Sequence, residues 1–416
     1  MRGTLKARIL SVAAALLLLT AGTATAQVRE PVATPPPSQL PGIKTAVIQN
    51  ATIDPNISAV IDQRSRFAHK EIGGRIGGKK SGYLAVTLPD PASVSVAASD
   101  LAQEGFDLAV ISGGDSLATV GIARANPDMV FLDIDQPLPC VTQDGIGDPS
   151  GTCTGGELAI PRNYSAVDFA VDEAAYLAGV IAASASRRDL LGIISGTSEC
   201  EECNRYIQGF ALGAQSVKPE IAVQLAFLAD EGDEAAFGDP VAAKTYAKAF
   251  IDVFEPEVVL PVAGAASRGI IEAACEAGIY AVGTEIDVSA VHPELEECIL
   301  TSVTKDFGYA VREAIFSVAN GDYEPAREFG LADGHVAATD EWTRLPGLPV
   351  ELSERYAAAE QAIVTGLVDT CPIGCGARFG SDNSAETDVD PTTSSEADPA
   401  ADAGADADSA ELDIQD

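Results

Sequence analysis

Basic side chains are scarce in this 416-residue chain, which has 26 Lys and Arg residues against 62 Asp and Glu residues. The formal net charge of −36 at pH 7 disfavours binding to nucleic acid or to an anionic membrane surface. Long apolar runs are missing after the N-terminus, so we expect no stable membrane insertion. The only histidines are His69, His292 and His335, and none accompanies a nucleophile motif. The sequence therefore predicts no enzyme, no metal site and no cofactor.

The first 26 residues have the form of a secretory signal peptide. Arg2, Lys6 and Arg8 precede an apolar run that is too short to span a bilayer and that ends in small residues. No cysteine stands at the expected cleavage point, which argues against a lipid anchor. Residues 27–42 are rich in proline and predict a linker. We expect a protein that is periplasmic or secreted.

The eight cysteines of an exported chain favour disulfides. Proximity in the sequence suggests four bridges, although it leaves the connectivity open: Cys140–Cys153, Cys200–Cys203, Cys275–Cys298 and Cys371–Cys375. The Cys-Glu-Glu-Cys motif that begins at Cys200 also has the spacing of a metal or redox site. No second pair of this kind and no histidine pair completes a zinc site, so we favour a structural disulfide.

Apolar runs of strand length alternate with helical segments at intervals of ~20–25 residues, which is the pattern of a doubly wound parallel sheet. Two such series flank a segment rich in Pro and Gly, and this predicts an α/β protein of two Rossmann-like lobes with a cleft between them. The acidic C-terminal segment cannot bury a core and should be a disordered, solubilising tail. The expected parts are the signal peptide 1–26, the linker 27–42, lobe 1 (43–165 plus 301–328), lobe 2 (166–300 plus 329–370) and the tail 376–416.

The stretch from Val258 to Lys305 is the most informative part of the chain. It predicts a buried strand, a turn of small residues, a helix and a second strand. On such sheets, ligands bind outside the carboxyl ends of the strands. Gly264 follows the first strand, while Glu285 and Asp287 follow the second. A carboxylate at such a position is a good partner for a hydroxyl-rich ligand.

Several motifs occur in an order that resembles a known family. They are FDLAVISGG, NPDMVFLDID, DEAAYLAGVIAA, LGIISG with YIQGFALGAQSVKP, FGDPVAAKTYAKAFI, VLPVAGAASRGIIEAACEAGIYAVGTEID and LTSVTK. From about Lys44 to Leu367 the chain resembles the basic membrane protein (BMP) family of bacterial substrate-binding proteins, which bind purine nucleosides for ABC importers. The resemblance implies a type I periplasmic-binding-protein fold, in which two lobes joined by three crossovers close on a ligand.

The resemblance also implies a set of ligand-binding residues. Phe237 corresponds to an aromatic that stacks on the purine, and Glu285 to an acid that holds the ribose hydroxyls. The complete implied set is Asp54, Asn56, Gly113, Asp115, Phe237, Gly264, Glu285, Asp287 and Lys305. The chain departs from the family in the cysteine-bearing segment 136–161, in the acidic tail and at two places of the implied site. The loop NATIDPNIS lacks the family's aromatic beside Asn, and Glu285 stands where the family has Asp.

The function that we expect is capture of a small ligand, a purine nucleoside, for delivery to an ABC permease by a monomeric binding protein. Two alternatives stay open. One is a binding protein for another small polar solute that feeds a signalling partner. The other is a nucleoside hydrolase, which would need a calcium-binding aspartate cluster such as Asp133 with Asp135. For Lys305 the alternative to ligand contact is an ion pair with Glu285 or Asp287 that fixes the closed form.

Overall fold

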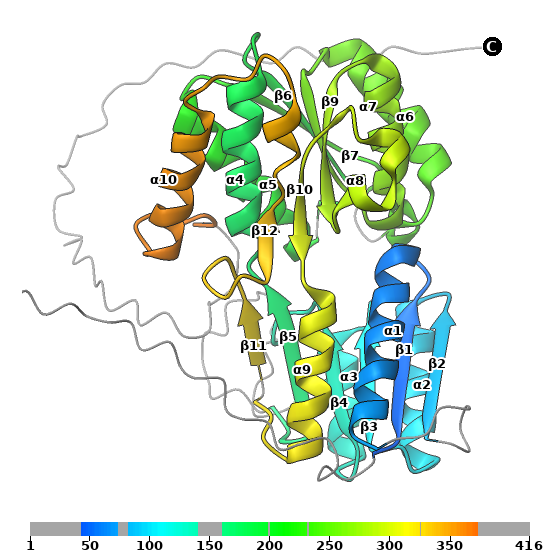
Figure 1. Cartoon of the computed structure of the whole chain (residues 1–416). Helices are drawn as coiled ribbons and strands as arrows, with labels where there is room; N and C mark the ends of the chain where they lie inside the picture. Colours follow the sequence, from blue (N-terminus) through cyan, green and yellow to red (C-terminus); the bar gives the residue numbers. More distant parts are fainter. Residues whose placement is uncertain are drawn as a thin grey trace, which may run out of the picture. The chain divides into compact units, whose positions relative to one another are not determined.

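The computed structural model describes residues 43–73, 82–139, 160–198, 200–230, 233–324 and 326–372. Within these ranges the chain forms two six-stranded sheets flanked by helices (Figure 1). The expected signal peptide, the linker and the acidic tail lie outside the described residues. So do Cys140, Cys153 and Cys375. None of the described helices is long and apolar enough to cross a membrane.

The first sheet has the strand order β11-β5-β4-β3-β1-β2, and every pairing in it is parallel. Its strands are β1 (Thr45–Asn50), β2 (Tyr83–Leu88), β3 (Leu108–Ser112), β4 (Val130–Ile134), β5 (Tyr164–Phe169) and β11 (Ala326–Phe329). Its helices are α1 (Pro55–Glu71), α2 (Pro91–Gln103), α3 (Ser116–Ala125) and α9 (Phe307–Asn320). Both β1 and β3 are buried along their whole length, as expected for parallel strands covered on two faces.

The second sheet has the order β12-β10-β9-β8-β6-β7, and only the short strand β12 is antiparallel. Its strands are β6 (Leu190–Ser195), β7 (Ala222–Phe227), β8 (Val258–Val262), β9 (Tyr280–Glu285), β10 (Ile299–Lys305) and β12 (Val336–Ala338). The helices that accompany it are α4 (Val171–Ala185), α5 (Glu201–Val217), α6 (Pro240–Phe254), α7 (Ser267–Ala277), α8 (Val288–Val291) and α10 (Leu352–Val364).

The chain passes between the two sheets three times: from β5 to α4, from β10 to α9, and from β11 to β12. Because β5 runs to Phe169 in the first sheet and β10 runs to Lys305 in the second, we propose lobe boundaries at these strand ends. They lie a few residues beyond positions 165 and 300. The carboxyl ends of the central strands of both sheets therefore face the region where the chain crosses over.

Helices α4 and α5 pack unusually closely because each carries glycine at the contact. A Cβ atom at Gly209 would collide with the backbone carbonyl of Asp172, and one at Gly213 with that of Tyr176. In the other direction, a Cβ at Gly179 would collide with the carbonyl of Phe210. This close approach holds the N-terminal turn of α5 beside the crossovers, where its side chains meet residues of both lobes.

Two disulfides join pairs of described residues in the second lobe. Cys200 joins Cys203 at the N-terminus of α5, and Cys275 on α7 joins Cys298 just before β10. The backbone N–H of Cys203 donates to the sulfur of Cys200, so the first bridge also caps the helix.

Candidate functional site

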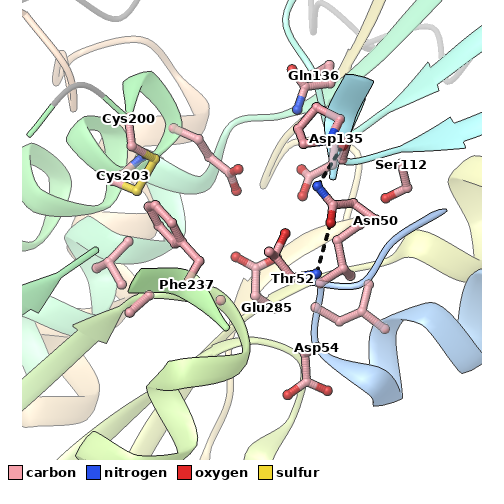
Figure 2. A pocket seen from close by; sticks show the side chains of 18 of the residues that line it. Asn50, Thr52, Asp54, Ser112, Asp135, Gln136, Cys200, Cys203, Phe237 and Glu285 are labelled. Carbon is pink, nitrogen blue, oxygen red and sulfur yellow. Dashed lines mark hydrogen bonds between the residues drawn. A yellow bond between two sulfur atoms is a disulfide. The ribbon is translucent and has the colours of Figure 1, made fainter. Parts of the chain in front are cut away.

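A cavity of about 580 Å³ lies between the carboxyl ends of the two sheets (Figure 2). This volume is within the usual range for small-molecule sites. Its lining comes from both lobes: Asn50, Thr52, Ile53, Asp54, Ile57, Pro91, Ser112, Gly113, Gly114, Asp115, Asp135, Gln136, Pro137, Thr197, Cys200, Glu202, Cys203, Tyr206, Phe237, Val262, Ala263, Gly264 and Glu285. In Figure 2, Phe237 and the Cys200–Cys203 disulfide lie across the cavity from Asn50 and Ser112.

The first-lobe wall is built on the turn after β1. The side chain of Asn50 is buried; its Nδ2 donates to the carbonyl of Gly113 at 3.2 Å, and its Oδ1 accepts the N–H of Thr52 at 3.0 Å. Gly113 has φ +71°, and a Cβ there would lie 2.7 Å from the Cβ of Asn50. Only glycine allows this approach without strain, so Asn50 and Gly113 together fix the turns after β1 and β3.

Asp54 and Asp115 line the cavity and also cap helices. The carboxylate of Asp54 accepts the N–H of Asn56 at the start of α1, and that of Asp115 accepts the N–H groups of Leu117 and Ala118 at the start of α3. Both acids therefore have a structural role as well as a place in the cavity wall. Asn56 lies in the first turn of α1 and is not among the residues that line the cavity.

Phe237 supplies the aromatic surface of the second-lobe wall. It ends the 3-10 helix Glu234–Phe237, directly before α6, whose N-cap is Asp239. The ring packs against the backbone of Gly196, where any Cβ atom would collide with it. The glycine after β6 thus makes room for the ring beside the cavity.

Gly264 lies at the point where the lobes touch. It has φ +52°, and a Cβ built on it would lie 3.3 Å from the carbonyl oxygens of both Phe237 and Thr52. Thr52 belongs to the first lobe and Phe237 to the second. The two lobes are therefore in contact beside the cavity.

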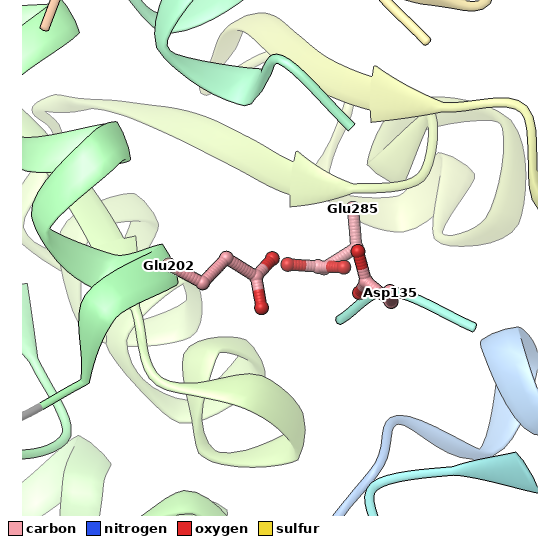
Figure 3. Close-up of side chains that lie close together, drawn as sticks. All are labelled: Asp135, Glu202 and Glu285. Carbon is pink, nitrogen blue, oxygen red and sulfur yellow. The ribbon is translucent and has the colours of Figure 1, made fainter. Parts of the chain in front are cut away.

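Three carboxylates from separate elements converge at one end of the cavity (Figure 3). Asp135 follows β4, Glu202 lies in the first turn of α5, and Glu285 ends β9. All three bind the ammonium group of Lys305, the last residue of β10: Asp135 at 2.8 Å, Glu285 at 3.0 Å, and Glu202 by a short contact. Tyr206 on α5 donates its hydroxyl to Glu285 at 3.1 Å.

Lys305 is held from several sides, and its side chain has no exposed surface. Its Nζ also lies 5.6–5.9 Å from the ring centroids of Phe169, Tyr206 and Phe307. Lys305 is thus behind the three acids and is not among the residues that line the cavity. The position between the three carboxylates, where a metal ion would sit, is occupied by this ammonium group.

Burial perturbs the pKa values of this cluster. It raises the pKa of Asp135 well above its ordinary value, and the neighbouring Glu202 carboxylate adds to the rise while Lys305 opposes it. Burial raises the pKa of Glu285 for the same reason, again against the effect of Lys305. Desolvation acts to lower the pKa of Lys305, but the carboxylates of Asp135, Glu202 and Glu285 outweigh it and hold that pKa well above its ordinary value.

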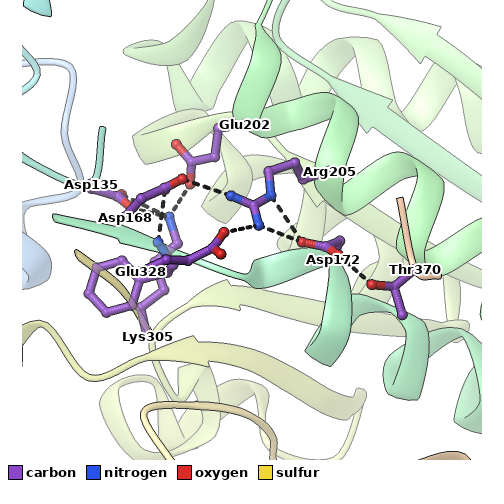
Figure 4. A network of polar contacts seen from close by, with 9 residues as sticks. Asp135, Asp168, Asp172, Glu202, Arg205, Lys305, Glu328 and Thr370 are labelled. Carbon is purple, nitrogen blue, oxygen red and sulfur yellow. Dashed lines mark hydrogen bonds and ion pairs between the residues drawn. The ribbon is translucent and has the colours of Figure 1, made fainter. Parts of the chain in front are cut away.

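A second buried network lies beside the first and also links the lobes (Figure 4). Arg205 on α5 donates to Asp168 on β5 at 2.7 Å, to Asp172 on α4 at 2.9 Å and to Glu328 on β11 at 2.6 Å. Burial raises the pKa of Asp168 to about 6, although Arg205 lowers it. Thr370 donates a short hydrogen bond to Asp172. The network thus ties the first and third crossovers to α5.

The structure brings most of the expected binding residues together, namely Asp54, Gly113, Asp115, Phe237, Gly264 and Glu285. Asp287 instead caps α8, where it accepts the N–H of Ala290. Thr52, Cys200, Glu202 and Tyr206 line the cavity but were not expected from the sequence. The sequence places Asp135 at the end of a predicted strand. No sequence pattern links it to Lys305, which is 170 residues away.

A family model described as "ABC transporter substrate-binding protein PnrA-like" (Bmp) matches residues 42–346. Basic membrane protein C of Borreliella burgdorferi strain N40 is 29% identical over 167 residues, which are 40% of this chain and 43% of that protein. The ABC transporter nucleoside-binding protein BmpA of Lactococcus lactis subsp. cremoris is 30% identical over 174 residues, 41% of each chain. The chain spans about half the length of the curated relatives it matches.

Solved structures are similar in fold. A solute-binding protein of an ABC transporter system from Aeropyrum pernix K1 has a TM-score of 0.57 at 18% identity, covering 78% of this chain and 92% of that one. The myo-inositol-binding protein of Caulobacter has a TM-score of 0.51 at 11% identity, covering 75% and 97%. These likenesses confirm the expected type I periplasmic-binding-protein fold. Since the family model matches most of the chain, the protein belongs to the family of PnrA-like ABC transporter substrate-binding proteins.

Proposed function

We propose that this protein is an exported binding protein that captures a purine nucleoside between its two lobes and delivers it to an ABC import permease. The observation that carries the proposal is the arrangement of the cavity. The half-buried ring of Phe237 offers a flat apolar surface to a base, and Asp135, Glu202 and Glu285 offer acceptors to hydroxyl groups. The name of the nucleoside-binding relative from Lactococcus lactis supports the same ligand class.

Binding by closure needs no catalytic step. A ligand that contacts both Asn50 and Phe237 interacts fully only when the lobes are closed, so it shifts the population toward the closed form. Hydrolysis has less support from the arrangement of side chains. The carboxylate of Asp133 is buried against the hydroxyl of Tyr164 at 2.8 Å and is not part of the described cavity lining, so it does not join Asp135 as a pair of calcium ligands there.

The first-lobe wall opposite Phe237 carries Ile53 and Ile57 and no aromatic residue among those described. We propose that these aliphatic side chains cover the second face of the base, in place of the aromatic that the family has beside Asn. Aliphatic contacts exclude water as well as an aromatic ring does, but they add no ring stacking.

Calorimetric titration of the mature protein with adenosine, guanosine, inosine, free bases, hexoses and amino acids tests the proposal. We expect binding by at least one purine nucleoside and little or none by the amino acids. A clear response to hexoses or polyols alone would assign the protein to a different ligand class, such as that of the myo-inositol-binding neighbour. Uptake of labelled nucleoside by cells with and without the gene separates import from delivery to a signalling partner.

A further inference from the structure

The cavity wall is strongly unbalanced in charge. Among the described residues that line it there are five carboxylates and no lysine, arginine or histidine. The five are Asp54, Asp115, Asp135, Glu202 and Glu285. Asp54 and Asp115 accept N–H groups at helix N-termini, where the helix dipole partly offsets a negative charge. The other three share a single cation, Lys305, so the carboxyl groups at that end of the wall outnumber the ammonium group by three to one.

The surplus charge is fixed in place. Asp135 and Glu285 have φ of +66° and +74°, which non-glycine residues adopt only when the surrounding structure holds them there. Lys305 forms ion pairs with both carboxylates, and the hydroxyl of Tyr206 donates a hydrogen bond to Glu285. The acidic side chains therefore cannot reorient toward bulk water when the lobes close. Closure excludes water from the cavity, and the repulsion between the carboxylates is stronger there than in water.

The ligand's charge must then affect its affinity. A phosphate would add negative charge beside the acidic end, whereas an ammonium group would offset the surplus and donate hydrogen bonds to carboxylates. We propose that the cavity selects its ligand by charge, favouring a nucleoside-sized molecule with a protonated amine on the part that reaches Asp135, Glu202 and Glu285, and rejecting molecules that carry a phosphate there. This inference uses the cavity of the proposed function and adds a charge requirement to it.

The test compares three charge states on one framework. Calorimetry at pH 7 and low salt measures the dissociation constants of adenosine, 5′-amino-5′-deoxyadenosine and adenosine 5′-monophosphate. We expect the amine to bind at least 10-fold more tightly than adenosine, and the phosphate at least 100-fold more weakly. Both ratios should shrink as salt rises, since salt screens the surplus charge where the cavity is open.

A matched pair of variants locates the effect. Glu202→Gln keeps an acceptor for Lys305 and removes one surplus charge, so it should lower the ratio of amine to phosphate affinity at least 10-fold. Glu220→Gln removes a charge from an exposed position outside the cavity and should leave that ratio unchanged. An equal loss of the ratio in both variants would mean that the net charge of the molecule, and not this wall, sets the preference.

A second set of probes separates this inference from the nucleoside proposal: glucosamine, glucose and glucose 6-phosphate. If no nucleoside binds but glucosamine binds more tightly than glucose, and glucose 6-phosphate most weakly, the nucleoside proposal fails and selection by charge stands. If adenosine binds and its monophosphate binds within threefold of it, selection by charge fails and the nucleoside proposal stands. Failure of all six probes to bind would overturn both.

Discussion

At the scale of single residues, small backbone features place the side chains of the cavity. Gly196 gives the ring of Phe237 its position, and Gly113 lets Asn50 approach the turn after β3. Asp135 and Glu285 hold positive φ values that direct their carboxylates at Lys305. Such unfavourable conformations persist only where the surrounding contacts stabilise them, and here they occur at the candidate site.

Phe237→Ala should weaken binding of a stacked purine by about 1–3 kcal/mol, a range taken from base stacking on aromatic residues in nucleic-acid-binding proteins. Gly196→Ala should weaken it too, because the added methyl group displaces the ring. The double variant should bind no worse than Phe237→Ala alone, since both changes remove one interaction. Calorimetry measures the affinity of all three variants. The control is Phe67→Ala, which removes a half-exposed ring on α1 outside the cavity. Unchanged affinity in Phe237→Ala would remove this ring from the site.

Asp133 should make the free energy of unfolding depend on pH. Burial raises its pKa from 3.8 to about 7, and no charged partner opposes the rise. The folded protein therefore keeps this proton between about pH 4 and pH 7, whereas the unfolded chain loses it. Stability falls as pH rises through that window, by roughly 4 kcal/mol in total for a shift of this size.

Asp133→Asn cannot ionise, so it should equal the wild type in stability at pH 4 and exceed it by a few kcal/mol at pH 8. Urea unfolding at both pH values measures the difference. Asp128→Asn, an exposed position in the same lobe, should show no such divergence. A variant that is less stable than the wild type at pH 8 would contradict a buried, protonated Asp133.

At the scale of elements, the N-terminal turn of α5 is the part on which the site most depends. Cys200 is the N-cap, Glu202 lies in this first turn, and Arg205 and Tyr206 lie in the next. This end of α5 therefore contributes to the cavity and to both buried networks. Its close packing on α4 through glycine holds it there. The disulfide between Cys200 and Cys203 fixes the first turn, where helices otherwise fray most readily.

We expect the two described disulfides to contribute differently. Cys200–Cys203 should affect ligand affinity, whereas Cys275–Cys298 should affect only the stability of the fold. The cysteines Cys200 and Cys203 are separated by only three positions in the sequence, so the bridge closes a short loop. Replacing both by serine should therefore cost only roughly 2 kcal/mol of stability. It also loosens Glu202, so ligand affinity should fall several-fold. Removing Cys275–Cys298, with a separation of 23, should cost roughly 3 kcal/mol but leave affinity nearly unchanged.

Thermal unfolding and calorimetry on the two double-serine variants check this contrast. Dithiothreitol titration of the wild type, with the reduced cysteines identified by alkylation, gives an independent measurement. Equal affinity losses from the two removals would mean that the bridge beside the cavity has no special effect on the site.

At the scale of the whole molecule, buried charge joins the two lobes. Arg205 connects Asp168 and Glu328 of the first sheet to Asp172 of the second lobe. Lys305 connects Asp135 to Glu202 and Glu285 across the same region. Removing one member of a buried network leaves the others uncompensated, so the penalty is much larger than for a surface ion pair.

Arg205→Met should destabilise the protein by about 3–5 kcal/mol, since three buried carboxylates lose their cation. Without Arg205 the pKa of Asp168, already about 6, should rise further. The variant should then lose more stability than the wild type as pH increases from 5 to 8. Urea unfolding measures both effects. Arg188→Met, which removes an exposed guanidinium that pairs with Glu255 and Glu257, should cost at most about 1 kcal/mol.

The sequence by itself determined the architecture. Alternation of apolar strands with helical segments is a local property, and it was enough to predict two lobes with parallel sheets. The rule that ligands bind at the carboxyl ends of strands then pointed to Gly264 and Glu285, and both line the cavity. The prediction for Phe237 came mostly from the family resemblance, because an isolated phenylalanine at a helix entry has no local pattern that separates a binding surface from a core residue.

Only the tertiary structure decided which charges meet. Asp135, Glu202, Glu285 and Lys305 lie on four elements, and their partnership depends on how the crossovers bring the two sheets together. From the sequence, Lys305 could pair with Glu285 or with Asp287. In the structure it pairs with Glu285 and with two acids on other elements, whereas Asp287 caps α8. Periodicity fixes which face of an element is buried, but pairing between distant residues is set by topology and packing.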